Sequence, residues 1–152
     1  MWEKAAEQYE IFLGMNGWVE DNILACLKLA DCYSKLERPD RARLAAARTF
    51  AYAPPRAEAC CKMGEFELSA HRYAEAAAWY QLALRLPKPS NPYARIDPAM
   101  WTWITHLQLC VCLDKLGRRE EAMRHNELAA EHVPDHPSVA FNRSYFRQFQ
   151  LQ

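Results

Sequence analysis

The stretches RPDRARLAAARTFAYAP (residues 38–54) and HRYAEAAAWYQLALRLP (residues 71–87) decide the fold of this chain. Both are rich in Ala and other strong helix formers, and each ends at a Pro, which a helix interior does not tolerate. When the two are aligned, Ala42 falls on Ala76, 34 positions later. A fixed period of this length indicates repeated supersecondary units, so further copies are expected in the rest of the chain.

A third copy, LQLCVCLDKLGRREEAMRHNELAAEHVP, occupies residues 107–134. Its Ala122 lies 46 positions beyond Ala76, which is one period plus an insertion of 12. The insertion is visible as PKPSNPYARIDPAM, where four Pro break the helical pattern. We therefore expect a long loop between the second and third copies.

Each copy carries small residues where two crossing helices must approach closely. They are Ala30, Gly64 and Cys110 in the first helices, and Ala42, Ala76 and Ala122 in the second helices. The Pro residues that end the second helices are Pro54, Pro87 and Pro134. This template resembles the tetratricopeptide (TPR) repeat, whose period has the same length. The resemblance implies an all-α TPR α-solenoid of antiparallel helix pairs wound into a right-handed superhelix.

We expect a single TPR domain over residues 1–152. Its parts are the second helix of a truncated repeat (2–13), three repeats (22–54, 55–87 and 100–134), an insertion loop (88–99) and a capping helix (137–149). Asp21 or Asn22 is expected to cap a helix over residues 22–36. Because the first helix of the earliest repeat is absent, the sequence suggests a piece cut from a longer protein. Whether Met1 is the natural start is left open.

Composition excludes several classes of function. Lys+Arg and Asp+Glu are equal at 19 each, so there is no basic footprint for nucleic acid. No apolar run is long enough to span a membrane, and the start MWEKAAEQYE lacks the apolar core of a signal peptide. The six Cys lie inside apolar helical text, which is typical of reduced, buried thiols in a cytoplasmic protein.

No motif for catalysis or for a cofactor is present. The sequence lacks G-x-S-x-G, P-loop, G-x-G-x-x-G and H-E-x-x-H patterns, and it has no C-x-x-C pair. His132 and His136 have the spacing of two ligands on one helix, but Pro134 lies between them. We therefore expect no enzyme activity, no cofactor and no metal. A metal or redox sensor built on the Cys pairs is the weakest hypothesis.

First helices of TPR stacks line a concave groove, which is the usual place for a partner. By the repeat register, the groove residues are Leu24, Leu27, Asp31, Lys35, Glu58, Cys61, Glu65, Leu68, Ile104, Leu107, Val111 and Asp114, extended by Tyr145 and Phe149. TPR domains that clamp a C-terminal carboxylate use Lys, Asn and Arg where this chain has Leu27, Asp31, Cys61 and Glu65. Acidic groups repel a carboxylate, so we expect a basic or amphipathic peptide instead. The alternative is a solvated surface with no ligand.

The insertion is a second candidate surface. Tyr93, Arg95, Trp101 and Trp103 lie in it or just after it, and aromatic and Arg side chains are favoured at interfaces. Alternatively, the two Trp residues pack the long loop onto the third repeat.

Beyond the generic repeat, five stretches resemble the TPR region that follows the catalytic domain in a group of bacterial family 2 glycosyltransferases. They are DNILACLKLADCY (21–33), PPRAEACCKMGEF (54–66), AAAWYQLAL (76–84), LQLCVCLDKLG (107–117) and HNELAAEHVPDHPSVAFNRSYF (125–146). The resemblance implies an accessory module for acceptor binding or dimerisation in a nucleotide-sugar-dependent enzyme. The Asp-x-Asp metal motif of such enzymes is absent here, so no catalytic residue is carried over. The alternative is a stand-alone adaptor for a peptide partner.

Self-association is a further expectation. The helix over residues 2–13 presents Ala5, Tyr9 and Phe12 where a missing first helix would pack. The possible partners are thus a protein or peptide, the catalytic domain of a parent chain, or a second copy in a homodimer. The sequence does not identify the partner, the oligomeric state, or the donor and acceptor sugars of any parent enzyme.

Overall fold

The computed structural model describes residues 1–150, and in that range it consists of helices joined by turns and loops, with no strand. The α-helices are α1 (Trp2–Gly14), α2 (Val19–Lys35), α3 (Pro39–Ala47), α4 (Ala57–Ser69), α5 (Tyr73–Arg85), α6 (Trp103–Lys115), α7 (Arg119–Ala130) and α8 (Pro137–Gln150). Two short 3-10 helices, η1 (Arg48–Ala51) and η2 (Pro98–Trp101), extend α3 and precede α6. Among these residues, no helix is long and apolar enough to cross a membrane.

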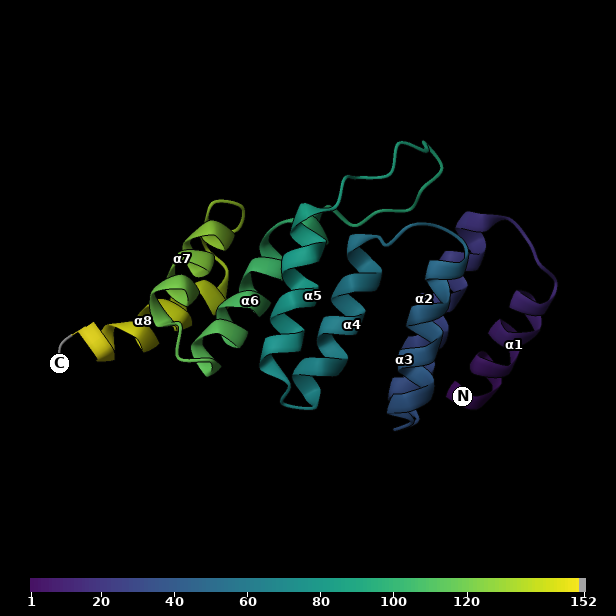
Figure 1. Ribbon diagram of the computed structural model, residues 1–152, viewed down its shortest axis with the longest axis horizontal. Helices are drawn as coiled ribbons and strands as arrows, with labels where there is room; N and C mark the ends of the chain where they lie inside the picture. Colours follow the sequence, from purple (N-terminus) through teal and green to yellow (C-terminus); the bar gives the residue numbers. More distant parts are fainter. Residues whose placement is uncertain (151–152) are drawn as a thin grey trace.

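The helices form a stack of antiparallel pairs, α2 with α3, α4 with α5, and α6 with α7 (Figure 1). In Figure 1 the chain advances along this stack, so its two ends lie at opposite ends of the molecule. Helix α1 packs on α2 at one end, and α8 packs on α7 at the other. The architecture is therefore an all-α solenoid, as the repeat period predicts.

The small residues that the sequence predicts for the helix crossings are all buried. Ala42, Ala76 and Ala122 of the second helices are fully buried, and Ala30, Gly64 and Cys110 of the first helices are also buried. At Gly64 the approach is tightest, because an added Cβ would stand 2.7 Å from Cζ of Tyr80. The ring of Tyr80 thus fills the space where a side chain larger than that of Gly would lie.

The turn inside each pair repeats with the same geometry. Glu37, His71 and Gly117 occupy equivalent positions and all have a positive φ, of 56°, 58° and 77°. The next residue donates its N–H to a carbonyl five residues back in each case, namely Arg38 to Tyr33, Arg72 to Glu67 and Arg118 to Leu113, all at 2.9 Å. This is the left-handed helix ending that Gly adopts most easily. Only the third copy has Gly there.

Two predicted boundaries are wrong. Helix α2 begins at Val19 with Trp18 as its N-cap, three residues before the predicted start. Asn22 therefore lies inside the helix, where its side-chain amide donates to the carbonyl of Gly17 at 2.9 Å. The third repeat was expected from residue 100, but its first helix α6 begins at Trp103 because residues 98–101 form the separate helix η2.

The insertion between α5 and α6 folds back over α4 towards the start of α2 (Figure 1). Asn91 donates to Glu20 of α2 at 3.1 Å, and Tyr93 meets Trp18 edge to face with ring centroids 5.6 Å apart. Glu20 also accepts two bonds from Arg56, at 2.7 and 2.8 Å. The loop is thus fixed to the first repeat, although the sequence places it next to the third.

Candidate partner-binding site

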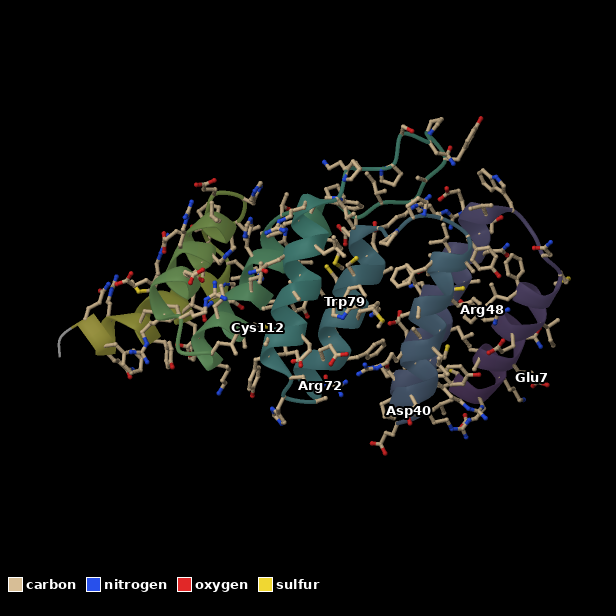
Figure 2. All side chains as sticks on the ribbon, in the orientation of Figure 1. Glu7, Asp40, Arg48, Arg72, Trp79 and Cys112 are labelled. Atoms are coloured by element: carbon tan, nitrogen blue, oxygen red, sulfur yellow. The ribbon has the colours of Figure 1, made fainter. Side chains whose placement is uncertain are left out.

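The first helices of the pairs lie side by side and form one continuous face, here called the first-helix face. Three contacts between neighbouring first helices establish this: Asp31 with Lys62 at 2.6 Å, Cys61 with Thr105 at 3.2 Å, and Tyr145 with Asp114 at 2.9 Å. They join α2 to α4, α4 to α6, and α6 to α8. On the side of the second helices, Phe50 of η1 stacks on Trp79 of α5 with ring centroids 6.2 Å apart. Figure 2 labels Trp79.

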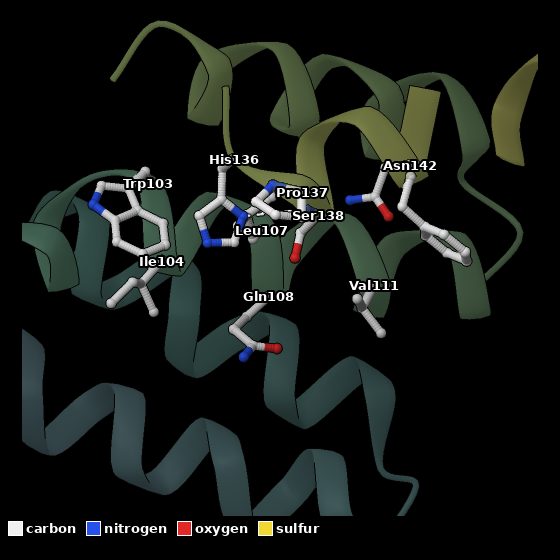
Figure 3. A pocket seen from close by; sticks show the side chains of 10 residues that line it. Trp103, Ile104, Leu107, Gln108, Val111, His136, Pro137, Ser138 and Asn142 are labelled. Carbon is white, nitrogen blue, oxygen red and sulfur yellow. Dashed lines mark hydrogen bonds between the residues drawn. The ribbon is translucent and has the colours of Figure 1, made fainter. Parts of the chain in front are cut away.

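A hollow of about 490 Å³ opens between α6 and α8 (Figure 3), and we call it the C-terminal hollow. It is lined by Trp103, Ile104, Leu107, Gln108, Val111, His136, Pro137, Ser138, Phe141 and Asn142. Within this lining, Phe141 is 71% exposed and Val111 is 40% exposed. No Asp, Glu, Lys or Arg belongs to the lining, so the hollow offers mainly apolar side chains with a few polar groups.

The walls of the C-terminal hollow are held by side-chain hydrogen bonds. Asn126 of α7 is buried and donates to the carbonyl of Val139 at 3.2 Å, while Asn142 donates to Asn126 at 2.9 Å. At the mouth, the rings of Trp103 and His136 pack with centroids 5.0 Å apart. The hollow is therefore preformed, which lowers the entropy cost of binding a ligand.

Of the residues predicted for the groove, Leu107 and Val111 come together in the C-terminal hollow, with Ile104 beside them. Asp31, Lys35 and Glu65 instead line a second hollow of about 480 Å³ at the other end, here called the N-terminal hollow. Leu27 and Glu58 border a crevice under Arg95 of the insertion. Leu24, Leu68 and Asp114 are partly buried on the first-helix face, as are Tyr145 and Phe149.

Cys61 is a correction to the predicted groove. It is only 2% exposed, because Thr105 and the chain around Met100 cover it. Burial raises the pKa of its thiol to about 12. This side chain does not face an open groove and is not available to a partner.

The acidic residues of the predicted groove are already paired within the chain. Lys62 bridges Asp31 at 2.6 Å and Glu65 at 3.2 Å. Glu58 accepts the backbone N–H of Asp97 at 2.9 Å, and Asp114 accepts the hydroxyl of Tyr145 at 2.9 Å with Arg119 at 3.6 Å. Paired carboxylates attract an added cation less strongly, so this geometry favours an amphipathic partner over a basic one.

The four residues predicted for the insertion surface have different environments. Trp101 packs on the core and donates its indole N–H to the carbonyl of Leu86 at 2.9 Å, which closes the base of the loop. Trp103 lines the C-terminal hollow instead. Tyr93 and Arg95 are exposed, with Tyr93 at 69%. They do not form one surface with the two Trp residues.

All six Cys are free and buried. Burial raises the pKa of Cys26, Cys60 and Cys112 to about 11 and that of Cys110 to about 12, so these thiols stay protonated at neutral pH. The thiolate is the reactive and metal-binding form, which argues against a redox or metal role. Among residues 1–150 no cluster of three or more His, Cys, Asp or Glu has the geometry to hold a metal ion.

Phe141 is the site residue that the sequence analysis missed. Its signal was the repeat period, because residue 141 lies 34 positions after Leu107, which was predicted to face the groove. The prediction extended the groove only to Tyr145 and Phe149. Helix α8 follows the register of a first helix, so Phe141 takes the equivalent place on the first-helix face.

Antiparallel helix pairs that repeat every 34 positions apart from one insertion, buried small residues and a face of first helices define the chain as a TPR-type α-solenoid. Structures titled "Crystal structure of MamA" and "Crystal structure of MamA protein" align with it at TM-scores of 0.69 and 0.68 and 18% identity. These alignments cover 94% of this chain and 77% and 72% of the two MamA chains. A third structure, titled MamA AMB-1, aligns at a TM-score of 0.61 and 19% identity over 98% of this chain and 88% of its own.

At such identities the similarity concerns the fold alone. No protein-family model matches the chain. No curated protein matches it either.

Proposed function

We propose that this chain is a non-catalytic protein-interaction module that binds the apolar face of an amphipathic segment in the C-terminal hollow. The observation that carries the proposal is the exposure of Phe141 and Val111 across a preformed hollow with no Asp, Glu, Lys or Arg in its lining. Exposed apolar side chains around a concave, preformed surface are typical of grooves that receive an amphipathic helix or strand.

Selection from a phage-displayed library of helical peptides tests this function. We expect the enriched peptides to share apolar residues at helical spacing and to lose most of their binding to Val111→Asp. The matched control is Leu44→Asp, which changes an exposed aliphatic residue on a second helix. Enriched peptides that bind Val111→Asp as tightly as wild type would contradict the proposal.

We further propose that the module works as the accessory region of a nucleotide-sugar-dependent glycosyltransferase in the bacterial cytoplasm. The five stretches that resemble the TPR region of family 2 glycosyltransferases support this, and buried thiols suit a reducing compartment. Sequencing the gene around the coding region is the test. A frame that joins this module to an α/β domain with an Asp-x-Asp motif is expected, and one that joins it to an unrelated domain would leave only the adaptor function.

A further inference from the structure

A hollow of about 370 Å³ opens between the second helices α1 and α3, and we call it the second-helix hollow. Its floor is formed by Leu29, Tyr33 and Ala45, which are at most 8% exposed. Leu44 stands at its rim and is 70% exposed. The remaining lining residues are Glu10, Arg41 and Arg48. The volume lies in the range of sites that hold small molecules.

The second-helix hollow is open because residue 45 is Ala. The equivalent residues in the second and third repeats are Trp79 and His125. Trp79 stacks on Phe50 and packs against the core cluster that contains Met63, which is the equivalent of Leu29 one period later. At the junction of the first and second repeats, an aromatic ring thus lies where Ala45 leaves space in the preceding junction.

The opening does not depend on helices outside the sequence. Glu10 is the one residue that α1 contributes to the lining, and the other six belong to α2, α3 and η1. Ala5 and Tyr9, which are expected to face the first helix paired with α1, line the N-terminal hollow instead. A first helix on that side of α1 would therefore fill the N-terminal hollow and leave the second-helix hollow open.

The charged groups of the second-helix hollow favour an anion. Arg48 donates to the carboxylate of Glu10 at 3.0 Å, and the hydroxyl of Tyr33 donates to the same carboxylate at 3.2 Å. Arg41 forms no ion pair among the described residues. Its guanidinium lies 5.7 Å from the centroid of the Tyr33 ring, a cation–π contact that holds it beside the hollow. The N–H groups of Arg41 are therefore free to bind a ligand.

We propose that the second-helix hollow is a binding site for a small aromatic carboxylate. The ring lies on Leu29 and Ala45, in the place that Trp79 takes at the next junction, and the carboxylate pairs with Arg41. This site is separate from the C-terminal hollow, whose lining contains no Asp, Glu, Lys or Arg. Its ligand therefore differs from the amphipathic segment proposed for that hollow.

Titration of the isotope-labelled protein with indoleacetate, followed by NMR of the backbone amides, tests the proposal. This probe combines the ring system of Trp with one carboxylate. Saturable shifts are expected for Leu44, Ala45 and Arg48, while Leu107 and Phe141 of the C-terminal hollow keep their positions. Indoleacetamide has the same ring without the charge, and it is expected to bind about fivefold more weakly, the factor that one partly exposed ion pair contributes.

Two variants separate the contact with the ring from the contact with the charge. Ala45→Trp gives the first repeat the side chain that the second repeat has at this position, and it is expected to abolish the saturable shifts. Arg41→Gln leaves the floor unchanged and is expected to weaken indoleacetate binding about fivefold without affecting indoleacetamide. The matched control is Arg38→Gln, which removes an exposed Arg outside the lining and should bind indoleacetate as wild type does.

Circular dichroism shows whether each variant keeps its helices. The absence of saturable shifts in wild type, shifts centred on the C-terminal hollow, or unchanged binding by a folded Ala45→Trp would overturn the proposal. If Ala45→Trp does not fold, Arg41→Gln decides. Equal affinity of Arg41→Gln and wild type for indoleacetate would then overturn it.

Discussion

Tyr80 of α5 packs directly on Gly64 of α4, where an added Cβ would stand 2.7 to 2.9 Å from three atoms of its ring. Tyr80 is fully buried and cannot move aside without opening the core. Gly64→Ala is therefore expected to lower the free energy of unfolding by about 1–3 kcal/mol, the usual cost of overpacking, although Ala is the better helix former. Urea denaturation measures the change.

Gly14→Ala is the matched control, since Gly14 ends α1 and has no atom within 4 Å of its added Cβ. This substitution is expected to raise the free energy of unfolding by up to about 1 kcal/mol. If Gly64→Ala and Gly14→Ala stabilise the protein to the same extent, the ring of Tyr80 leaves room for a methyl group at position 64, and the account is wrong on this point.

A substitution in the turn at Glu37 is expected to stabilise the protein, in contrast to Gly64→Ala. Glu37 has a φ of 56°, a conformation that costs a side-chain-bearing residue about 1 kcal/mol and costs Gly nothing. Glu37→Gly is expected to raise the melting temperature, because Gly117 already takes this position in the third repeat. The control is Glu131→Gly after α7, where φ is −60° and Gly should destabilise. A lower melting temperature for Glu37→Gly would mean that its side chain makes a contact worth more than the strain.

The repeat register could be predicted from the sequence because it depends on local features. Small residues at the crossings and Pro after the second helices follow directly from close backbone approach and from the missing N–H. The insertion could not be placed in this way. Asn91 reaches back to Glu20, which is far earlier in the chain, and nothing in PKPSNPYARIDPAM identifies so distant a partner.

Only part of the candidate site could be predicted, because the sequence gives the helical register but not the contacts between repeats. Leu107 and Val111 follow from helical register alone, and they line the C-terminal hollow. Cys61 follows the same register but is buried, because η2 and Thr105 cover it. The sequence could not show that the acidic side chains of this face would already be paired, since Lys62 comes from a different repeat than Asp31.

The histidine pair His106 and His125 predicts an acid-sensitive third repeat. Their Nδ1 atoms are 2.8 Å apart between α6 and α7. Burial, and after it the charges of His125 and His132, lower the pKa of His106 to about 4. Burial also lowers the pKa of His125. The charged groups around the pair are His132, Arg124, Arg118 and Glu121.

Because both pKa values are lower in the folded state than in the unfolded state, neutral histidine favours folding. This contribution is complete above about pH 6.5, the pKa of an unfolded His, and is lost as the pH falls towards 4. Melting temperature measured across this range is expected to fall more steeply for wild type than for the double variant His106→Leu, His125→Leu. His71→Leu changes an exposed His and should leave the slope as in wild type. Equal slopes for all three proteins would exclude a role for the pair.

Glu20 holds the insertion in place. It is buried at 7% exposure, it accepts two bonds from Arg56 and one from Asn91, and the bond from Arg56 lowers the pKa of its carboxyl. Glu20→Ala is expected to release the loop, so that trypsin cleaves after Arg95 several-fold faster. Asn91→Ala removes the bond to Glu20 and the bond that Asn91 accepts from the N–H of Tyr93, but it leaves the pair of Arg56 with Glu20, so it should have a smaller effect. Unchanged cleavage in both variants would show that other contacts hold the loop.

The central claim is that the C-terminal hollow, and not another face, receives the partner. Site-specific photo-crosslinking tests it most directly, with a photoreactive residue placed at Val111 in the hollow or at Leu44 on a second helix. The probe is an amphipathic peptide enriched on the wild-type protein. Cross-linking from Val111 that is competed by unlabelled peptide, with little from Leu44, is the predicted result. Equal yield at both positions, or a higher yield at Leu44, would contradict the account.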